Sequence, residues 1–327
     1  MNSIGNPAPL PADRIGLGCM GFSWGYSRPG QLDDNASVST IREAFDAGIR
    51  HFDTSDMYGA GHNEELVGKA FANNSDVYIA TKGGIVVDSV EPLQMHVDGS
   101  TRYLRDALDA SLRRLNREHV DLYYLHRLDG TIPVQEQVQV LADAQAAGKI
   151  RNIGVSEPTY DQLVAASEVV TIDAVQSELS VWTRDPLKDQ PSEHADSKTN
   201  VLQWCEDNGA SLVAFSPLGR GYLTGTLNTS ELMEGDFRSW MPRFTPDAQE
   251  RNAVILETLQ RIAEKHGVAT SQVALAWVLS VSPAVKAIPG SRSIAHIVSN
   301  YEAANVQLDA DDIAAINDLP EPTESRY

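Results

Sequence analysis

Eight short apolar segments recur along the sequence, and longer stretches with helical periodicity separate them. The predicted strands are residues 14–20, 49–54, 77–82, 120–126, 150–156, 173–177, 211–216 and 284–289. Strands that alternate with helices are typical of parallel sheets, because a parallel connection has to cross back over the sheet. Eight such units within 327 residues match the count of a (β/α)8 TIM barrel. The order of elements therefore predicts an α/β fold of this type.

Three of the intervening stretches have a clear helical period. Residues 101–116 place a leucine on one side at almost every turn, and residues 134–147 and 250–266 are also apolar on one side. Gly148 and Gly267 directly follow the second and third stretches. Because glycine readily takes the left-handed conformation in which many helices end, we predict helices over these three ranges.

The main structural alternative is a doubly wound open sheet, which also alternates strands and helices. No G-x-G-x-x-G motif follows the first predicted strand, since the spacing at Gly16, Gly18 and Gly21 begins within that strand, and no shift in composition divides the chain. We therefore expect one barrel domain over residues 1–327. The weakly periodic, glycine-containing stretch 217–249 is expected to form a long loop after the seventh strand, and loops of that length often serve as lids or binding segments.

The chain is strongly acidic, with a formal net charge of −19. This charge argues against nucleic acids and anionic membranes as partners, since both would be repelled. Cys19 and Cys205 form no C-x-x-C pair and are expected to be reduced thiols. The N-terminus has no basic start followed by an apolar run, and no apolar run approaches the roughly 18 residues of a membrane span. A cytoplasmic location is expected.

Four residues suited to proton chemistry lie near the ends of three successive predicted strands. Asp53 is near the end of the second strand and Tyr58 follows five residues later, while Lys82 and His126 end the third and fourth strands. Singly, each has an ordinary structural explanation as a turn former, a packing group or a core hydrogen-bonding group. Because a barrel's active site lies at the C-terminal ends of its strands, the four together indicate a catalytic site. Asp56 lies between Asp53 and Tyr58 in the sequence, and it is expected to cap a turn or face solvent.

The chemistry that fits these residues is proton donation to a carbonyl oxygen. A tyrosine with a pKa of about 10 becomes a useful acid near neutral pH when a neighbouring cation stabilises its phenolate. Lys82 is placed to supply that cation, and Asp53 to pair with Lys82. His126 is suited to orient the substrate oxygen or to share in the proton transfer. The set has no metal-ligand spacing, and it lacks a source of electrons.

Nearly the whole chain carries a series of motifs, in the order "FDTSDMYG", "IATKGG", "YYLHRLD", "GKIRNIGVSE", "VQSELS", "AFSPLGRGYLTG" and "IPGSRSIAHIVSN". Together they resemble the aldo-keto reductase family. The segments "GLGCMGFS" and "SELSVWTRD" resemble its bacterial, plant and fungal branch, which includes pyridoxal reductase-like and auxin-induced-type members. The resemblance implies a barrel that transfers hydride from NADP(H) to an aldehyde or ketone. It also implies a catalytic tetrad of Asp53, Tyr58, Lys82 and His126, with Tyr58 as the general acid.

Two loops suggest where a cofactor phosphate would bind. In barrels of this type the loops after the seventh and eighth strands often form a phosphate site, and here they read "SPLGRGYLTG" and "PGSRS". Both combine small residues, which let backbone N–H groups approach an anion, with an arginine suited to bidentate phosphate contact. Each loop alone could be a surface turn. Their shared face with the four strand-end residues favours cofactor binding.

The resemblance implies roles in NADP(H) binding for particular residues. Phe215 takes the place of the ring that stacks on the nicotinamide, and Ser156 and Gln176 match the residues that hold its carboxamide. The residues that match the pyrophosphate loop are Ser216, Leu218, Gly219 and Arg220. Those that match the region around the adenosine 2'-phosphate and the adenine are Ser291, Arg292 and Asn300.

Three positions depart from the family pattern. Glu157 stands where many members have an asparagine that contacts the carboxamide. Gly290 replaces a lysine, and His296 an arginine, that bind the 2'-phosphate in other branches. Arg292 remains as the expected phosphate partner.

The substrate rim is expected in loops of the same face. Its candidates are Phe22, Trp24, Met57 and Trp182, with Trp240 in the long loop. A mostly apolar pocket of this kind suits a small-molecule carbonyl substrate of medium size. Two other functions stay open: a cofactor-binding regulatory protein, like the β subunits of potassium channels, and a Schiff-base aldolase that uses Lys82. The sequence indicates neither the substrate nor the oligomeric state.

Overall fold

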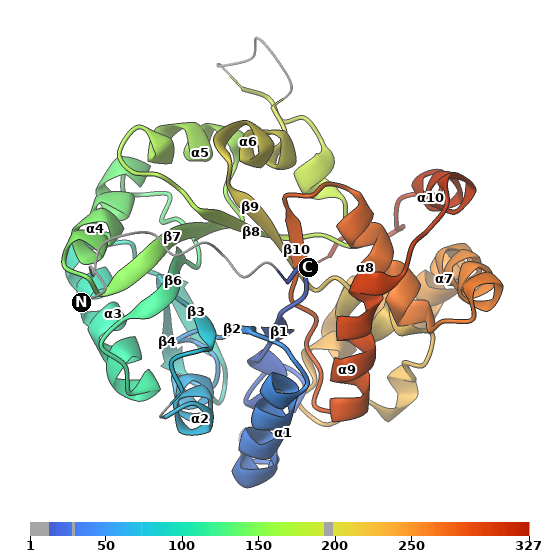
Figure 1. Ribbon diagram of the computed structural model, residues 1–327, viewed down its shortest axis with the longest axis horizontal. Coiled ribbons are helices and arrows are strands. Elements are labelled where there is room, and N and C mark those ends of the chain that lie inside the picture. The colour runs from blue at the N-terminus through green and yellow to red at the C-terminus, as the bar shows by residue number, and fades with distance from the viewer. Residues whose placement is uncertain (1–12, 28–29, 73, 193–198, 327) are drawn as a thin grey trace.

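The computed structural model describes residues 13–27, 30–72, 74–192 and 199–326. Within them, eight parallel strands form one sheet in the order β1-β2-β3-β6-β7-β8-β9-β10. A parallel bridge joins Ile15 to Ala287, and the N–H of Gly16 donates to the Ala287 carbonyl at 2.8 Å. The sheet is therefore closed, and Figure 1 shows its strands as a ring with helices around it. The predicted barrel is confirmed, and the open-sheet alternative is wrong.

All eight predicted strands are present. They are β1 (Leu17–Gly18), β2 (His51–Asp53), β3 (Tyr78–Gly83), β6 (Val120–Leu125), β7 (Ile150–Ser156), β8 (Ala174–Glu178), β9 (Ser211–Phe215) and β10 (Val285–Ala287). The sequence predicts no signal peptide at the N-terminus. Residues 1–12, which are most of that segment, lie outside the described residues.

Helices connect the strands and cover the outside of the barrel (Figure 1). They are α1 (Asp34–Asp46), α2 (His62–Ala70), α3 (Thr101–Leu115), α4 (Val134–Ala146), α5 (Tyr160–Ser167), α6 (Val201–Asn208), α7 (Pro246–His266), α8 (Thr270–Ser280), α9 (Ile294–Glu302) and α10 (Ala310–Asn317). The three helices predicted from periodicity are α3, α4 and α7. Left-handed residues follow them as expected, at Gly148 (φ 74°) and Gly267 (φ 65°), and at Asn116 (φ 53°) after α3.

Two segments interrupt the regular alternation at the C-terminal end of the barrel. An antiparallel hairpin of β4 (Ile85–Ser89) and β5 (Gln94–Val97) directly follows β3. The predicted loop 217–249 contains a series of short 3-10 helices, which begins with η3 (Gly219–Thr224), and its last residues belong to α7. The hairpin was not predicted, because its strands are short and Met95 on β5 is half exposed, so they carry no buried alternating face.

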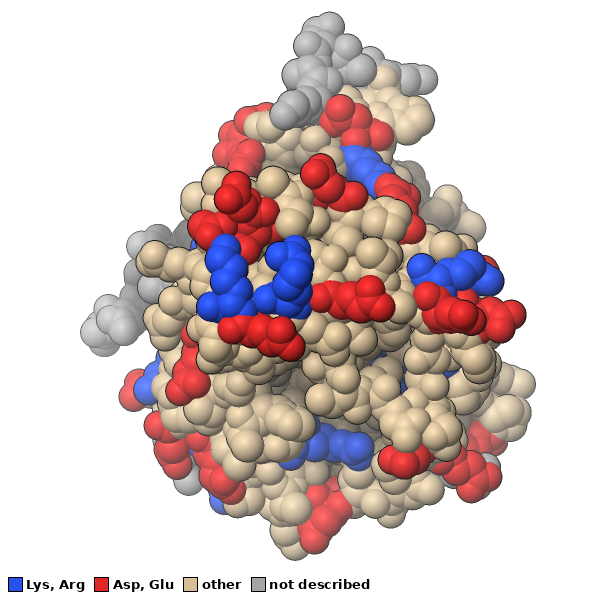
Figure 2. Space-filling view, turned by 90° about the vertical axis from the view of Figure 1, so that its right-hand side faces the viewer, with Lys and Arg blue, Asp and Glu red and all other residues tan. Residues whose placement is uncertain are grey.

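The surface mixes both signs of charge. Figure 2 shows one face of the molecule, on which Lys and Arg side chains lie next to Asp and Glu side chains. Lys265 of α7, for example, lies 2.5 Å from Asp309 and 2.8 Å from Asp312 at the start of α10. His266 joins these two carboxylates in a group close enough to hold a metal ion, and the Lys265 ammonium already neutralises part of its charge. None of the described helices has the length and apolarity needed to cross a membrane.

Small residues make room for large ones inside the barrel. A cluster that includes Tyr78, Ala80 and Tyr124 fills its interior, and Tyr124 is completely buried. Gly154 of β7 pairs with Tyr124 across the sheet. A Cβ atom at Gly154 would lie 2.3 Å from Tyr124 Cδ1. The glycine is therefore required by the tyrosine ring beside it.

We predict that Gly154→Ala lowers the free energy of unfolding by about 1–3 kcal/mol, because the added methyl overpacks the barrel interior. Urea denaturation followed by tryptophan fluorescence measures this change. Gly130→Ala is the matched control, since a Cβ atom there meets nothing within 4 Å. Its stability is expected to stay within about 0.5 kcal/mol of the parent. Equal stability of the Gly154→Ala protein and the parent would contradict the packing described.

Candidate functional site

The four predicted strand-end residues meet at the C-terminal end of the barrel. Lys82 Nζ lies 2.5 Å from Asp53 Oδ1 and 3.3 Å from the Tyr58 hydroxyl. It also donates to the Thr54 carbonyl at 2.8 Å. The ring centroids of Tyr58 and His126 are 5.9 Å apart, with the rings nearly perpendicular at 86°. The structure thus brings together all four residues that the sequence singled out.

The turn between β2 and α2 carries Tyr58 back over the barrel mouth. Gly59 and Gly61 have φ angles of 61° and 98°, in the left-handed region that favours glycine, and they let the chain reverse before α2. Asn63, in the first turn of α2, is completely buried and holds this turn in place. Its amide accepts from Thr54 Oγ1 at 2.7 Å and donates to the Cys19 carbonyl at 2.8 Å. Sequence reasoning missed Asn63, because nothing local distinguishes it from a surface asparagine.

Lys82 is charged despite its burial. Its side chain is 0% exposed and that of Asp53 is 3% exposed. Burial by itself lowers the pKa of Lys82, but the Asp53 carboxylate and the Tyr58 hydroxyl outweigh burial, so the net shift of the pKa is upward. The Asp53 carboxylate is in turn held on its other oxygen by Gln176 Nε2 at 2.8 Å. The lysine is therefore a fixed cation directly beneath the tyrosine.

The phenol of Tyr58 is more weakly acidic than the sequence argument expected. Burial raises its pKa, and the Lys82 ammonium lowers it by less, so the net shift is upward. Lys82 lowers this pKa as the sequence argument expects, and the larger effect of burial decides the net direction. The phenol holds its proton at neutral pH.

His126 is a neutral imidazole at neutral pH. It is buried, and burial together with the cations Lys82 and Arg127 lowers its pKa well below the ordinary value of 6.5. Its Nδ1 atom lies 3.0 Å from Ser55 Oγ. A neutral imidazole has one N–H donor and one bare nitrogen, so the bond at Nδ1 decides what the other nitrogen can do.

The three predicted nicotinamide-binding residues lie on successive strands beside the tetrad. They are Ser156 of β7, Gln176 of β8 and Phe215 of β9. Gln176 donates to Asp53, as described above, and Ser156 Oγ accepts from Arg127 Nη1 at 3.1 Å. Phe215 is partly buried and packs against the apolar cluster inside the barrel. These side chains present an aromatic ring, an amide and a hydroxyl at one face of the barrel, a set that fits a flat polar ring such as nicotinamide.

The predicted pyrophosphate loop is a tight turn with a left-handed conformation at Gly219 (φ 55°). Within it, the Gly219 N–H donates to the Ser216 carbonyl at 2.9 Å and the Gly221 N–H to the Leu218 carbonyl at 3.0 Å. Gly219 also lies against Trp182, since a Cβ atom there would be 2.7 Å from Trp182 Cε3. Arg220 is buried, and its Nη2 atom donates to Glu178 Oε2 at 2.8 Å. Its charge is therefore balanced inside the protein.

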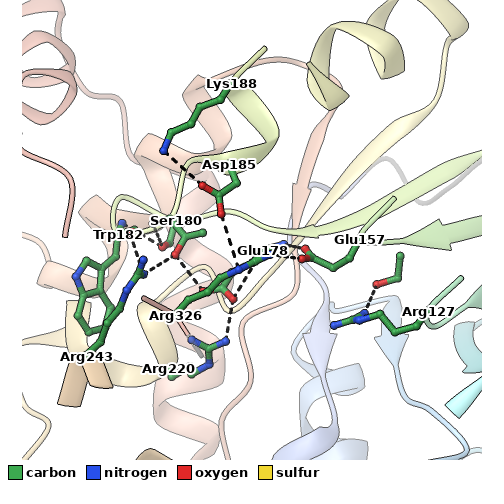
Figure 3. Close-up of polar contacts among 12 residues, drawn as sticks. Arg127, Glu157, Glu178, Ser180, Trp182, Asp185, Lys188, Arg220, Arg243 and Arg326 are labelled. Carbon is green, nitrogen blue, oxygen red and sulfur yellow. Dashed lines mark hydrogen bonds and ion pairs between the residues drawn. The ribbon is translucent and has the colours of Figure 1, made fainter. Parts of the chain in front are cut away.

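A cluster of acids and arginines lies next to this loop (Figure 3). Glu157 accepts from the Glu178 N–H at 2.8 Å and from Arg326 Nη2 at 2.5 Å. Arg326 Nη1 is 3.6 Å from Glu178, and Arg326 Nε is 3.8 Å from Asp185. Glu157 has a φ of 53°, in the left-handed region where asparagine is favoured over glutamate. Its carboxylate is thus bound to β8 and to the C-terminal segment.

Of the predicted adenosine-end residues, Ser291 and Arg292 precede α9, and Asn300 lies near its C-terminal end. Ser291 Oγ accepts from the Ser293 N–H at 3.2 Å, Arg292 is exposed and Asn300 is buried. A Cβ atom at Gly290 would lie 3.1 Å from the carbonyl oxygen of Gly18. This close approach gives a physical reason for the glycine at a position where other branches have lysine.

The residues predicted to form the substrate rim differ in their burial and in their neighbours. Trp24 lies over the tetrad, with its ring centroid 6.2 Å from that of Tyr58. Phe22 and Trp182 are each 1% exposed and belong to the core, and Met57 is buried as well. Trp182 stacks on Tyr222 with centroids 4.4 Å apart, so it packs against the loop that contains Gly219. Trp240 is 68% exposed.

Two further polar residues next to the tetrad were missed or misjudged from the sequence. Arg127 follows His126 directly and bonds to Ser156. Asp56, expected to cap a turn or face solvent, instead accepts from Ser55 Oγ at 3.2 Å and from the Tyr103 hydroxyl at 3.4 Å. The contacts of Arg127 with Ser156 and of Asp56 with Tyr103 join residues from different elements, and no local pattern reveals them.

Comparison with known proteins identifies the class. The model of the aldo/keto reductase family matches residues 14–321. A Glycine max protein named probable aldo-keto reductase 1 is 36% identical over 305 residues, which cover 93% of this chain and 84% of that protein. Aldo-keto reductase yakc (NADP(+)) of Schizosaccharomyces pombe is 33% identical over 309 residues, which cover 93% of this chain and 86% of that protein.

A solved structure shares the fold over nearly its full length. The glycerol dehydrogenase AKR11B4 from Gluconobacter oxydans superposes with a TM-score of 0.84 at 30% identity, covering 97% of this chain and 95% of that chain. Together with the family match, this likeness defines the class of the protein. The chain belongs to the aldo/keto reductase family.

We predict that Lys82→Met lowers the free energy of unfolding by about 3 kcal/mol, because it leaves the Asp53 carboxylate buried without its cation. Adding Asp53→Asn to this variant is expected to recover part of the loss, since no charge then remains unpaired. Urea denaturation of the two single variants and the double variant measures this coupling. Strictly additive effects of the two substitutions would contradict a tight buried pair.

Proposed function

We propose that this protein reduces an aldehyde or ketone to the alcohol with NADP(H), and that Tyr58 is the general acid. The observation that carries the proposal is the contact of a charged, buried lysine with a protonated tyrosine at the barrel mouth, at 3.3 Å. A neutral imidazole lies beside that tyrosine, with its ring nearly perpendicular to the phenol. This set of groups can bind a carbonyl oxygen and protonate it.

The residues of the site act on the substrate oxygen. The Tyr58 hydroxyl and His126 Nε2 hold this oxygen, and Trp24 covers the space above Tyr58. NADP(H), when bound, supplies the hydride. As negative charge develops on the substrate oxygen, Tyr58 transfers its proton to it, and the Lys82 ammonium stabilises the phenolate that remains. Asp53 keeps Lys82 charged and aimed at Tyr58.

The upward shift of the pKa of Tyr58 is compatible with this role. A phenol of raised pKa does not ionise before the substrate is reduced, so no competing phenolate accumulates at neutral pH. The oxygen of a reduced carbonyl is a much stronger base than a phenolate, and the proton therefore moves downhill once hydride has been transferred. The position of the Tyr58 hydroxyl at the substrate oxygen therefore matters more than the pKa of Tyr58 before the reaction.

The donor set also supports the choice of cofactor. Gln176, Ser156 and Phe215 line the face where a nicotinamide ring would lie, and Leu218 and Gly219 belong to the glycine-rich loop that is the expected pyrophosphate site. Arg292 is exposed beside α9 and is the expected contact of a 2'-phosphate. The yakc protein of Schizosaccharomyces pombe carries NADP(+) in its name, which favours the same cofactor for this chain.

The two other functions are less well supported. A Schiff-base aldolase needs a neutral lysine as nucleophile, but the pKa of Lys82 is raised and its amine is held by Asp53. A purely regulatory protein has no need for an assembled proton-transfer tetrad. The glycerol dehydrogenase likeness favours a reaction that also runs toward alcohol oxidation.

Tyr58→Phe is expected to lower kcat/KM for carbonyl reduction by about 10²–10⁴-fold, because no other group replaces the lost proton donor. NADPH binding should stay nearly unchanged. The measurements are NADPH oxidation followed by absorbance across a panel of aldehydes and ketones, and a fluorescence titration of NADPH. Tyr160→Phe, on the outer helix α5, is the matched control and should keep full activity. Normal kcat in Tyr58→Phe would rule out the proposed acid.

The cofactor proposal predicts a lower dissociation constant for NADPH than for NADH. Arg292→Gln should weaken NADPH binding by about tenfold or more and leave NADH binding almost unchanged, since a charge-assisted hydrogen bond contributes about 1.5–3 kcal/mol. Fluorescence titration with both cofactors measures the difference. Arg102→Gln, on the exposed face of α3, serves as the charge-matched control, because its side chain is 94% exposed. Tighter binding of NADH by the parent protein would overturn the assignment.

A further inference from the structure

The hydroxyl of Ser55 joins two titratable side chains at the edge of the tetrad. Ser55 Oγ lies 3.0 Å from His126 Nδ1 and 3.2 Å from Asp56 Oδ1. The backbone N–H of Met57 donates to the same oxygen at 3.3 Å. Ser55 is completely buried, so its hydrogen bonds have to be made with these neighbours.

The proton count allows two complete arrangements of these bonds. A serine hydroxyl donates one hydrogen bond and accepts two, and the Met57 N–H always takes one of the accepting positions. In the first arrangement, Ser55 donates to ionised Asp56 and accepts from the Nδ1–H of His126. In the second, protonated Asp56 donates to Ser55, and Ser55 donates to a bare Nδ1. Every donor and acceptor position of the hydroxyl is satisfied in both.

The two arrangements leave His126 in opposite tautomers. Because the imidazole is neutral, it carries one proton, either on Nδ1 or on Nε2. In the first arrangement Nε2 is bare and can only accept a hydrogen bond. In the second Nε2 carries the proton and can donate to a carbonyl oxygen. One proton gained at Asp56 therefore changes the behaviour of a nitrogen on the far side of the ring.

We propose that Ser55 transmits the protonation state of Asp56 to His126 and thereby sets whether His126 Nε2 donates or accepts a hydrogen bond at the substrate oxygen. The inference rests on the proposed carbonyl reduction, in which His126 touches that oxygen. Ser55 and Asp56 are positioning residues and do not touch the substrate. Protonated Asp56 favours carbonyl reduction, and ionised Asp56 favours alcohol oxidation, in which Nε2 accepts the hydroxyl proton.

The surroundings of Asp56 allow both states near neutral pH. Burial and the neighbouring Glu64 raise the pKa of Asp56 to about 7, against the opposing effect of Ser55 and Arg114. The titratable and charged groups that face it from other elements are Glu64 of α2, Tyr103 and Arg114 of α3, and Tyr123 of β6. Those that face His126 are Tyr58, Lys82 and Arg127.

The neighbours of Asp56 have hydrogen-bond partners of their own. Glu64 is completely buried, and its two oxygens accept from Arg114 Nε at 2.6 Å and from Thr81 Oγ1 at 2.5 Å. Burial and Asp56 itself raise the pKa of Tyr103 beyond the neutral range, so this hydroxyl stays protonated and can donate to Asp56. Tyr103 therefore presents the same donor to Asp56 throughout the neutral range.

A second acceptor for Ser55 leads to the same conclusion. Ser55 Oγ lies 3.5 Å from the Lys82 carbonyl, and donation to that oxygen would also leave Ser55 accepting from His126 Nδ1. A proton on Asp56 supplies the additional hydrogen, so that Ser55 accepts from Asp56 and donates to His126 Nδ1. The protonation state of Asp56 therefore decides whether Ser55 donates to His126 Nδ1 or accepts from it.

The first test reads the tautomer directly, without turnover. Nitrogen NMR of the cofactor-free protein with ¹⁵N-labelled histidine distinguishes Nδ1–H from Nε2–H, and His126→Asn identifies the His126 signals. Between about pH 5.5 and 8.5, the parent should pass from Nε2–H to Nδ1–H with a midpoint near the Asp56 pKa of about 7. Asp56→Asn, whose amide donates to Ser55, should hold Nε2–H throughout. One unchanged tautomer in the parent across this range would overturn the proposal.

The second test reads the consequence for catalysis. In the parent, kcat/KM for carbonyl reduction should fall by about 10²-fold as pH rises through 7, since a donor to the developing oxyanion is lost. Asp56→Asn should keep the low-pH rate, and Ser55→Ala should remove the dependence on Asp56. Asp88→Asn, which removes an exposed carboxylate of β4, is the control and should keep the parent profile.

The two tests separate failure of the relay from failure of the proposed function. If the parent reduces carbonyls with the same pH profile as Asp56→Asn, the proposed function holds and the proposed relay is wrong. If the parent shows the tautomer change but reduces no carbonyl, the proposed relay holds and the proposed function is wrong. Ser55→Ala and Asp56→Asn change few atoms, and their circular dichroism and melting temperatures verify that both fold.

Discussion

The buried contact between Lys82 and Asp53 is the interaction on which the rest of the site depends. A buried charge without a partner costs several kcal/mol, so neither residue is tolerated at the barrel interior without the other. The sheet register pairs Asp53 with Ala80, which places Lys82 one inward-facing position further along β3. At that height the ammonium reaches the Tyr58 hydroxyl as well as the carboxylate. The register of two strands therefore sets the charge beside the proposed acid.

A second balanced group of charges surrounds the proposed cofactor loop. Glu178 pairs with Arg220, Glu157 pairs with Arg326, and Arg326 also approaches Glu178. Arg220 has a left-handed conformation (φ 54°), and its guanidinium is bound to Glu178 inside the protein. Arg326 fastens the C-terminal segment to the ends of β7 and β8. The carboxylates of Glu157 and Glu178 at this face of the barrel are therefore paired with arginines.

The fold was predictable because its signals are local. Each strand is a short apolar run, and α4 and α7 end at glycines that the sequence shows directly. The four tetrad residues were predictable for a related reason, since the carboxyl ends of parallel strands meet at one face. The roles assigned to these four residues remain proposals. The β4–β5 hairpin was not predictable, because its strands lack a buried face.

The sequence by itself determined the barrel, the position of the proposed site and the four residues at its centre, because strand order and strand ends are written in local patterns. Only the tertiary structure decided how those residues behave. It shows that burial outweighs Lys82 in setting the pKa of Tyr58, that Trp182 is a core residue, and that Asp56 reaches His126 through Ser55. Burial and contacts between distant segments arise when the chain packs, and no single stretch of sequence contains them.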